Sequence, residues 1–205
     1  MRSPMALLQA AVQSVPVFYL AMLWPGRSAF RGLWSTDAYY PAIMYDSGAW
    51  SVWLLIATLS VTPILLLINR IGRVQGFGRW LLRRRRHLGL GSAIYAALHL
   101  WYYLAHERSL PAVLFDLWQL EFAVGWLSFA LFVILALTSN AWSVRRLGRK
   151  WKSLHLLVYP AAALALWHWH LLDWYVGRSI FWCGVCLVPL VIRPALRRVR
   201  RPIQS

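Results

Sequence analysis

The chain has 205 residues, of which 60% are hydrophobic and 14% are charged, and its mean hydropathy is +0.52. This composition, with 14 tryptophans, excludes a soluble domain with a polar surface and indicates an integral membrane protein. The net charge of +16 would suggest nucleic-acid binding in a soluble protein. In a membrane chain the retention of basic residues on the cytoplasmic side explains the charge, so we expect no nucleic-acid partner.

Six apolar segments approach the length of about 20 residues that a membrane-spanning helix needs. They cover residues 5–24, 48–69, 88–106, 118–139, 153–174 and 176–192. We therefore predict an all-α integral membrane protein with a six-helix transmembrane bundle. A proline in the first segment, Pro16, is expected to kink that helix. The predicted divisions are a first helix with its outer loop (1–47), a helical core (48–193) and a basic tail (194–205).

Basic residues alternate between the two ends of these segments. Counting loops from the N-terminus, 18 of the 22 lysines and arginines fall on one side, in runs such as 83–86 and 145–152, and all six acidic residues fall on the other. Because lysine and arginine are retained on the cytoplasmic side, both termini are predicted to be cytoplasmic, and anionic lipid headgroups are natural partners.

Histidines in the apolar segments are the strongest functional signal, since an ionisable side chain inside a membrane is costly and usually functional. His99 lies 13 positions after Arg86, and His168 lies 16 positions after Lys152, so a rise of about 1.5 Å per residue places both in the outer half of the membrane. His155 and His87 lie directly after the basic runs, at the inner edge. Two parallel helices thus present imidazoles at two levels.

Two levels of imidazole suit a transmembrane haem pathway. A haem that only transfers electrons is best held by two strong neutral ligands, and imidazole is such a ligand. We therefore predict haem iron ligated by His99 and His168, with His155 as a ligand at a second level or a neighbour of a cofactor there. His87 is a weaker candidate because it continues an arginine run. A structural role, in which the imidazoles hydrogen-bond to neighbouring helices, stays open as the alternative.

A helical phase of about 100° per residue sets His155 and His168 some 140° apart around a regular helix. Pro160 lies between them and is expected to introduce a kink or a π-type bulge that resets the phase. Small residues before each outer histidine, among them Gly91, Ser92 and Ala96 and the run 161–163, either leave room for a flat macrocycle or form ordinary helix contacts.

The only two cysteines form a C-x-x-C pattern, Cys183-Gly184-Val185-Cys186, in the last segment. The pattern lacks the soluble α/β context that gives it redox meaning, so packing of two small residues is the favoured interpretation. The sequence has no nucleophile elbow, phosphate loop or G-x-G-x-x-G motif. We therefore expect no catalytic residue of its own and no nicotinamide-binding unit.

Several short motifs resemble one family. They are Gly48-Ala49-Trp50, the run from Thr58 to Pro63, Arg85-Arg86-His87-Leu88-Gly89-Leu90 with Tyr95 and His99, Leu137-Thr138-Ser139, and Leu147 to His155 with Tyr159 and His168. Together they resemble the bacterial ferric-reductase-like transmembrane proteins, and within them the haem-binding membrane subunits of periplasmic methionine sulfoxide reductase systems. The resemblance covers about 47–194.

The resemblance implies b-type haem, with one or two groups per chain, held by His99, His155 and His168, together with a non-covalent FMN. It also implies electrons drawn from the quinone pool, a location in the bacterial inner membrane, and delivery to a periplasmic molybdopterin-containing subunit that reduces methionine sulfoxide in oxidised proteins. The chain itself would be an electron-transfer subunit. Two alternatives remain: a stand-alone haem ferric or cupric reductase, and a small transporter or scaffold with structural histidines.

Overall fold

The structure is a computed structural model that describes residues 14–33, 40–68, 75–173, 177 and 180–186. Every regular element in these residues is helical, which confirms the all-α prediction. In chain order the elements are α2 (Val15–Leu23), η1 (Arg27–Leu33), α3 (Tyr40–Ile68), α4 (Gln75–Glu107), α5 (Leu110–Asp116), α6 (Leu120–Leu137), α7 (Ala141–Leu147), α8 (Arg149–Leu154), η2 (His155–Leu157) and α9 (Val158–Leu172). Residues 180–186 are also helical.

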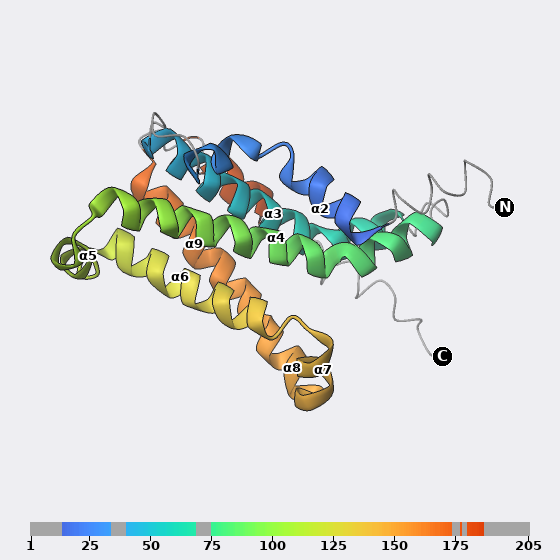
Figure 1. Cartoon of the computed structure of the whole chain (residues 1–205). Helices are drawn as coiled ribbons and strands as arrows, with labels where there is room; N and C mark the ends of the chain where they lie inside the picture. The colour runs from blue at the N-terminus through green and yellow to red at the C-terminus, as the bar shows by residue number, and fades with distance from the viewer. Residues whose placement is uncertain (1–13, 34–39, 69–74, 174–176, 178–179, 187–205) are drawn as a thin grey trace.

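The long helices form two antiparallel pairs (Figure 1). Helix α3 packs along α4, and α6 packs along α9. The short helix α5 joins α4 to α6 at one end of the molecule, while α7 and α8 lie at the opposite end, where the second pair diverges from the first. The two pairs contact each other near the α5 end and also through an apolar cluster that α3 shares with α6 and α9.

Two apolar clusters hold these elements together. One lies between α3, α6, α9 and residues 182–186, and includes Leu55, Phe132 and Cys186. The other joins α2 and η1 to α3 and α4 around Tyr95 and Tyr102. These two tyrosines are almost fully buried, and their hydroxyls donate to backbone carbonyls of Leu23 at 3.1 Å and Ala29 at 2.7 Å. Both buried polar groups are thus satisfied.

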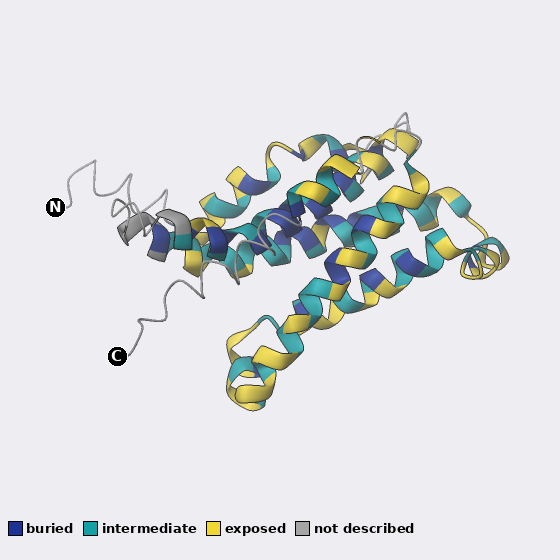
Figure 2. Ribbon diagram, turned by 180° about the vertical axis from the view of Figure 1, so that it is seen from behind, coloured by how far each residue is buried: buried dark blue, intermediate teal, exposed yellow. Residues whose placement is uncertain are grey.

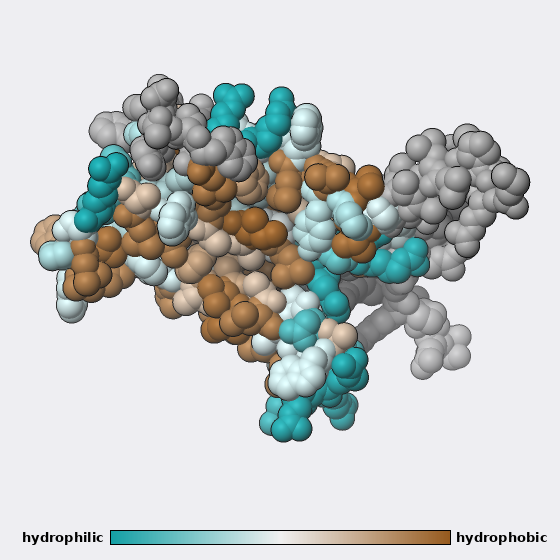
Figure 3. Space-filling view, viewed as in Figure 1, coloured by the Kyte–Doolittle hydropathy of each residue, from teal (hydrophilic) through white to brown (hydrophobic). Residues whose placement is uncertain are grey.

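The surface of the helices supports a membrane location. Among the described residues, two helical stretches are long and apolar enough to cross a bilayer, Pro41–Leu66 in α3 and Leu120–Leu137, which is α6. Only 22% of the α6 stretch is buried, and Leu127 and Leu137 expose more than half of their surface. Exposed residues run along this helix, and hydrophobic side chains cover the middle of the molecule (Figures 2 and 3). Such a surface is stable in lipid and costly in water.

The helix boundaries correct two of the predictions. The first segment was predicted to kink at Pro16, but α2 begins at Val15, so this proline lies in the first turn, where its missing N–H costs nothing. The segment 153–174 was predicted to be one helix with a kink or bulge at Pro160. Instead the chain passes through α8 and the 3₁₀ turn η2 before α9 begins at Val158, and Pro160 again lies in a first turn.

The parts of the predicted segments at 5–13 and 187–192, and the basic tail at 194–205, lie outside the described residues.

Candidate functional site

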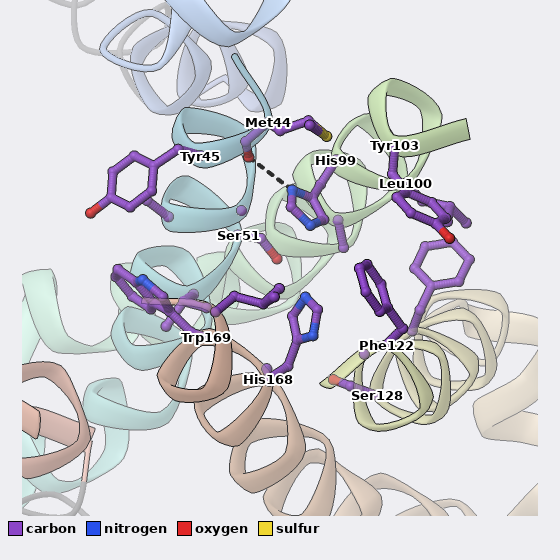
Figure 4. A pocket seen from close by; sticks show the side chains of 18 of the residues that line it. Met44, Tyr45, Ser51, His99, Leu100, Tyr103, Phe122, Ser128, His168 and Trp169 are labelled. Carbon is purple, nitrogen blue, oxygen red and sulfur yellow. Dashed lines mark hydrogen bonds between the residues drawn. The ribbon is translucent and has the colours of Figure 1, made fainter. Parts of the chain in front are cut away.

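A cavity of about 820 Å³ lies between the two helix pairs near their α5 end. It is lined by residues of α3, α4, α6 and α9, most of them apolar, including Val52, Phe129 and Phe132. His99 from α4 and His168 from α9 both point into it and face each other (Figure 4). Their ring centroids are 6.1 Å apart, and the ring planes are inclined by 81°. The structure thus brings together the two outer histidines, as their predicted depth suggested.

Each of these imidazoles is held by a backbone carbonyl on the helix beside it. The Nδ1 atom of His99 lies 2.8 Å from the Met44 carbonyl oxygen on α3, and the Nδ1 atom of His168 lies 2.6 Å from the Glu121 carbonyl oxygen on α6. A carbonyl oxygen only accepts hydrogen bonds, so Nδ1 donates in both rings. In a neutral imidazole the lone pair is then on Nε2, the nitrogen that is free to ligate a metal.

The spacing of the two rings fits a single metal between them. A ligating imidazole nitrogen lies about 2 Å from its metal, and the ring centre lies about 1 Å further away, so two imidazoles on opposite sides of one metal have centroids about 6 Å apart. The observed 6.1 Å meets that requirement. The apolar walls and the volume of the cavity leave room for a largely hydrophobic group around the metal.

His155 occupies a different environment at the start of η2 and does not line the cavity. Its Nε2 atom lies 3.2 Å from the Thr138 hydroxyl oxygen, and its ring stacks on the Trp151 indole at a centroid distance of 4.0 Å. The Trp151 indole N–H in turn donates to the Thr138 carbonyl at 2.9 Å. His155 is therefore fixed at the end of the α6–α9 pair remote from His99 and His168.

The inner pair expected from the sequence is not brought together by these contacts. His87 makes its hydrogen bond to the Tyr19 hydroxyl, with 3.1 Å between Nδ1 and the oxygen, and packs beside Phe18. The partners of His87 are on α2. Those of His155 are Thr138, directly after α6, and Trp151, on α8. Of the two remaining described histidines, His106 lines the cavity and His170 is exposed.

The small residues divide between the two roles that the sequence left open. Of the residues named from the sequence, Ala96 lines the cavity, so it leaves room there. Ser92 and Ala161 are fully buried at helix contacts instead. Cys186 packs in the apolar cluster of α3, α6 and α9, and both cysteines are free thiols, as the packing interpretation predicts.

Sequence reasoning missed the groups that hold the rings. These are the carbonyls of Met44 and Glu121 and the glycines Gly48 and Gly125, which lie directly against the two imidazoles. A sequence signal for them exists, because both glycines begin the pattern G-x-x-S, as Gly48 to Ser51 and Gly125 to Ser128.

Two facing histidines between antiparallel helix pairs place the chain in a class of all-helical membrane proteins. The family model for the ferric reductase like transmembrane component matches residues 47–166. The chain is similar to curated proteins named protein-methionine-sulfoxide reductase heme-binding subunit MsrQ. The one from Brucella ovis is 44% identical over 162 residues, which cover 76% of this chain and 69% of that protein. The one from Rhizobium meliloti is 36% identical over 161 residues, covering 75% and 70% respectively.

The chain therefore belongs to the ferric-reductase-like transmembrane family, and the resemblance inferred from the short motifs is confirmed.

Proposed function

We propose that the chain is a membrane electron-transfer subunit that binds b-type haem between His99 and His168 and passes electrons outward across the bacterial inner membrane. One observation carries this proposal: two imidazoles face each other across an apolar cavity, with centroids 6.1 Å apart. The relatives are named as heme-binding subunits, which supports the choice of haem over a bare metal ion.

The protein's own residues would prepare the site for a low-spin iron. Nε2 of His99 and Nε2 of His168 would hold the iron, and the Nδ1 bonds to the Met44 and Glu121 carbonyls would raise the basicity of both imidazoles. A haem held by these two imidazoles would supply one-electron reduction and reoxidation. The mostly apolar lining of the cavity would limit the access of water to the iron.

The inner end would receive electrons at the level of His155. Its stacking on Trp151 and its hydrogen bond to Thr138 hold the ring in place at the inner level, whereas His168 lies at the outer level. We assign it to a second haem or to the neighbourhood of a second cofactor. The quinone pool or a cytoplasmic flavin donor would supply the electrons, and FMN stays a prediction without assigned residues.

The proposed acceptor is a periplasmic molybdopterin-containing subunit that reduces methionine sulfoxide in oxidised proteins. The relatives are named as heme-binding subunits of a protein-methionine-sulfoxide reductase, which favours a reductase of this kind as acceptor over an external metal ion. The proposal includes six membrane spans with both termini in the cytoplasm.

Difference spectroscopy of the purified chain tests the haem site. We expect sharp reduced-minus-oxidised bands in the wild type, loss of the outer-haem signal in His99→Ala and in His168→Ala, and a wild-type spectrum in the exposed control His170→Ala. A colourless preparation from haem-replete cells would overturn the proposal. Full haem signals in both cavity variants would overturn the ligand assignment.

A second measurement decides the acceptor. The chemically reduced chain is mixed either with the oxidised periplasmic reductase or with a ferric chelate, and reoxidation is followed in a stopped-flow instrument. We expect rapid reoxidation by the reductase alone. Reoxidation only by the ferric chelate would show a stand-alone metal reductase instead.

A further inference from the structure

The two halves of the cavity are built on the same spacing of residues. In the α3–α4 pair, Met44, Gly48 and Ser51 lie on α3 and face His99 on α4. In the α6–α9 pair, Glu121, Gly125 and Ser128 lie on α6 and face His168 on α9. In each pair the carbonyl comes four residues before the glycine, and the serine comes three residues after it.

The contacts made by these residues also match. Ser51 donates to the Ser92 carbonyl at 3.0 Å, and Ser128 donates to the Ala161 carbonyl at 3.0 Å. Each accepting carbonyl lies seven residues before the histidine of its own helix. The serine hydrogen bond therefore sets the register of the two helices in each pair. The hydrogen bond from Nδ1 to the carbonyl is made two turns away, at the same spacing in both pairs.

Both glycines lie where the imidazole comes closest to the neighbouring helix. A Cβ atom at Gly125 would be 2.7 Å from Nδ1 and 2.8 Å from Cε1 of His168, which is too close for the ring to stay where it is. A Cβ atom at Gly48 would be 3.1 Å from Nδ1 of His99, a tight contact that a small movement would relieve. A side chain at either position would push the ring away from the carbonyl that holds it.

We propose that Gly48 and Gly125 are positioning residues, each of which lets a carbonyl four residues earlier hold the facing imidazole by Nδ1 and turn its Nε2 atom into the cavity. This inference rests on the proposed haem ligation by His99 and His168 and names what sets the orientation of those two ligands. Because the two pairs hold the rings independently, the steep angle of 81° between the ring planes is built into the protein.

Three glycine-to-alanine variants of the purified, haem-loaded chain test the proposal. Gly125→Ala and Gly48→Ala add a methyl group against an imidazole. Gly89→Ala is the matched control, because it lies in α4 and its Cβ would make an ordinary contact of 3.7 Å with Thr58. The readouts are the g values of the oxidised haem in electron paramagnetic resonance, which report ligand-plane orientation, and the rate of haem transfer to apomyoglobin.

We expect altered g values and faster haem loss in the order Gly125→Ala, Gly48→Ala, Gly89→Ala, with the control equal to wild type. Loss of a partner that orients a metal-ligating histidine weakens metal binding by about 10- to 100-fold, so haem loss from Gly125→Ala should be faster by about that factor. If Gly125→Ala does not fold, as judged by its helical circular dichroism, Gly48→Ala decides the question alone.

Unchanged g values and haem-loss rates in the variants that fold would overturn the proposal. So would lower thermal stability with unchanged g values, because that result would mean a purely structural role. The histidine variants separate this failure from failure of the proposed function. If His99→Ala and His168→Ala keep their haem, the ligand assignment itself is wrong. If these two variants lose haem while the glycine variants keep wild-type g values and haem-loss rates, the positioning role alone is rejected.

Discussion

At the residue scale, reciprocal hydrogen bonds join the first helix pair two turns away from His99. Ser51 donates to the Ser92 carbonyl at 3.0 Å, and Ser92 donates back to the Ser51 carbonyl at 2.8 Å, with both side chains buried. In a membrane such bonds hold helices at close range, although each contributes only modestly to stability.

Replacement of Ser92 by alanine should lower the free energy of unfolding by about 1 kcal/mol, since one buried interhelical bond is lost. The measurement is denaturation by sodium dodecyl sulfate in mixed micelles, followed by circular dichroism. The exposed control Ser153→Ala should change stability by less than about 0.5 kcal/mol. Equal stability of the two variants would show that the reciprocal bonds contribute nothing.

The sequence predicted the pairing of His99 with His168 because depth in the membrane follows from distance to the basic runs. Depth says nothing about rotation around the helix axis, so the carbonyls of Met44 and Glu121 could not be inferred. Their side chains carry no signal, since the contact is made by the backbone. The repeated G-x-x-S pattern was the available sign, and it is too short to be noticed without the facing helices in place.

At the element scale, hydropathy predicted the cores of the helices better than their ends. Helix α6 covers 120–137 where 118–139 was predicted, but α4 starts at Gln75 where the apolar segment starts at 88. Arginine is a good helix former, so the helix continues through the charged run beyond the apolar part. The break at η2 escaped prediction because residues 153–158 are as apolar as a helix interior.

The turn between α7 and α8 depends on glycine. Gly148 has φ of 51° and ψ of −121°, a region that side-chain-bearing residues rarely adopt, and its Cβ would meet no other atom. Gly148→Ala should therefore destabilise the protein by about 1–3 kcal/mol through the backbone alone. Thermal unfolding in detergent measures this. Gly184→Ala, in the helical stretch 180–186, is the control and should be neutral or slightly stabilising; an equal loss in both variants would contradict the argument.

His155 should be separable from the outer site, because it contacts Thr138 and Trp151 and does not line the cavity. In His155→Ala we expect the spectrum of the outer haem to persist while its reduction by a quinol donor slows at least about tenfold, in line with the loss of a cofactor-site residue. Stopped-flow reduction in proteoliposomes measures the rate. Loss of the outer haem, or reduction at the wild-type rate, would contradict the proposed role at the inner level.

At the scale of the whole molecule, the distribution of charge predicts how the protein is oriented in the membrane. The α7–α8 end carries the basic run from Arg145 to Lys152, whereas the α5 end carries Asp116 and Glu107. The cavity lies near the α5 end, which places it on the outer side if basic residues stay in the cytoplasm. This placement suits delivery of electrons to a periplasmic partner.

Labelling of single cysteines tests this orientation. In a chain with Cys183→Ala and Cys186→Ala, a membrane-impermeant maleimide should label Ser109→Cys in intact spheroplasts and Arg149→Cys only after permeabilisation. The reason is that basic loops are retained in the cytoplasm. The opposite pattern would place the cavity on the cytoplasmic side and contradict outward electron delivery.

The all-α membrane class was predictable, but the way in which the helices pair was not. The six spans stay a prediction, because two helical stretches among the described residues are long and apolar enough to cross a bilayer. The predicted membrane helices are only weakly amphipathic, because apolar residues occur on all of their sides. The sequence therefore does not show which helix faces pack against each other. The pairing of α3 with α4 and of α6 with α9 emerges from small residues and backbone carbonyls, which hydropathy does not register.

The most direct test of the central claim is an experimental structure of the haem-loaded chain, by electron cryomicroscopy with a bound antibody fragment to increase its size. The account predicts one haem in the cavity between α4 and α9, with its iron bonded to Nε2 of His99 and Nε2 of His168, and with both Nδ1 atoms still bonded to the Met44 and Glu121 carbonyls. A map in which the cavity is empty of haem, or in which iron is held by other side chains, would contradict it.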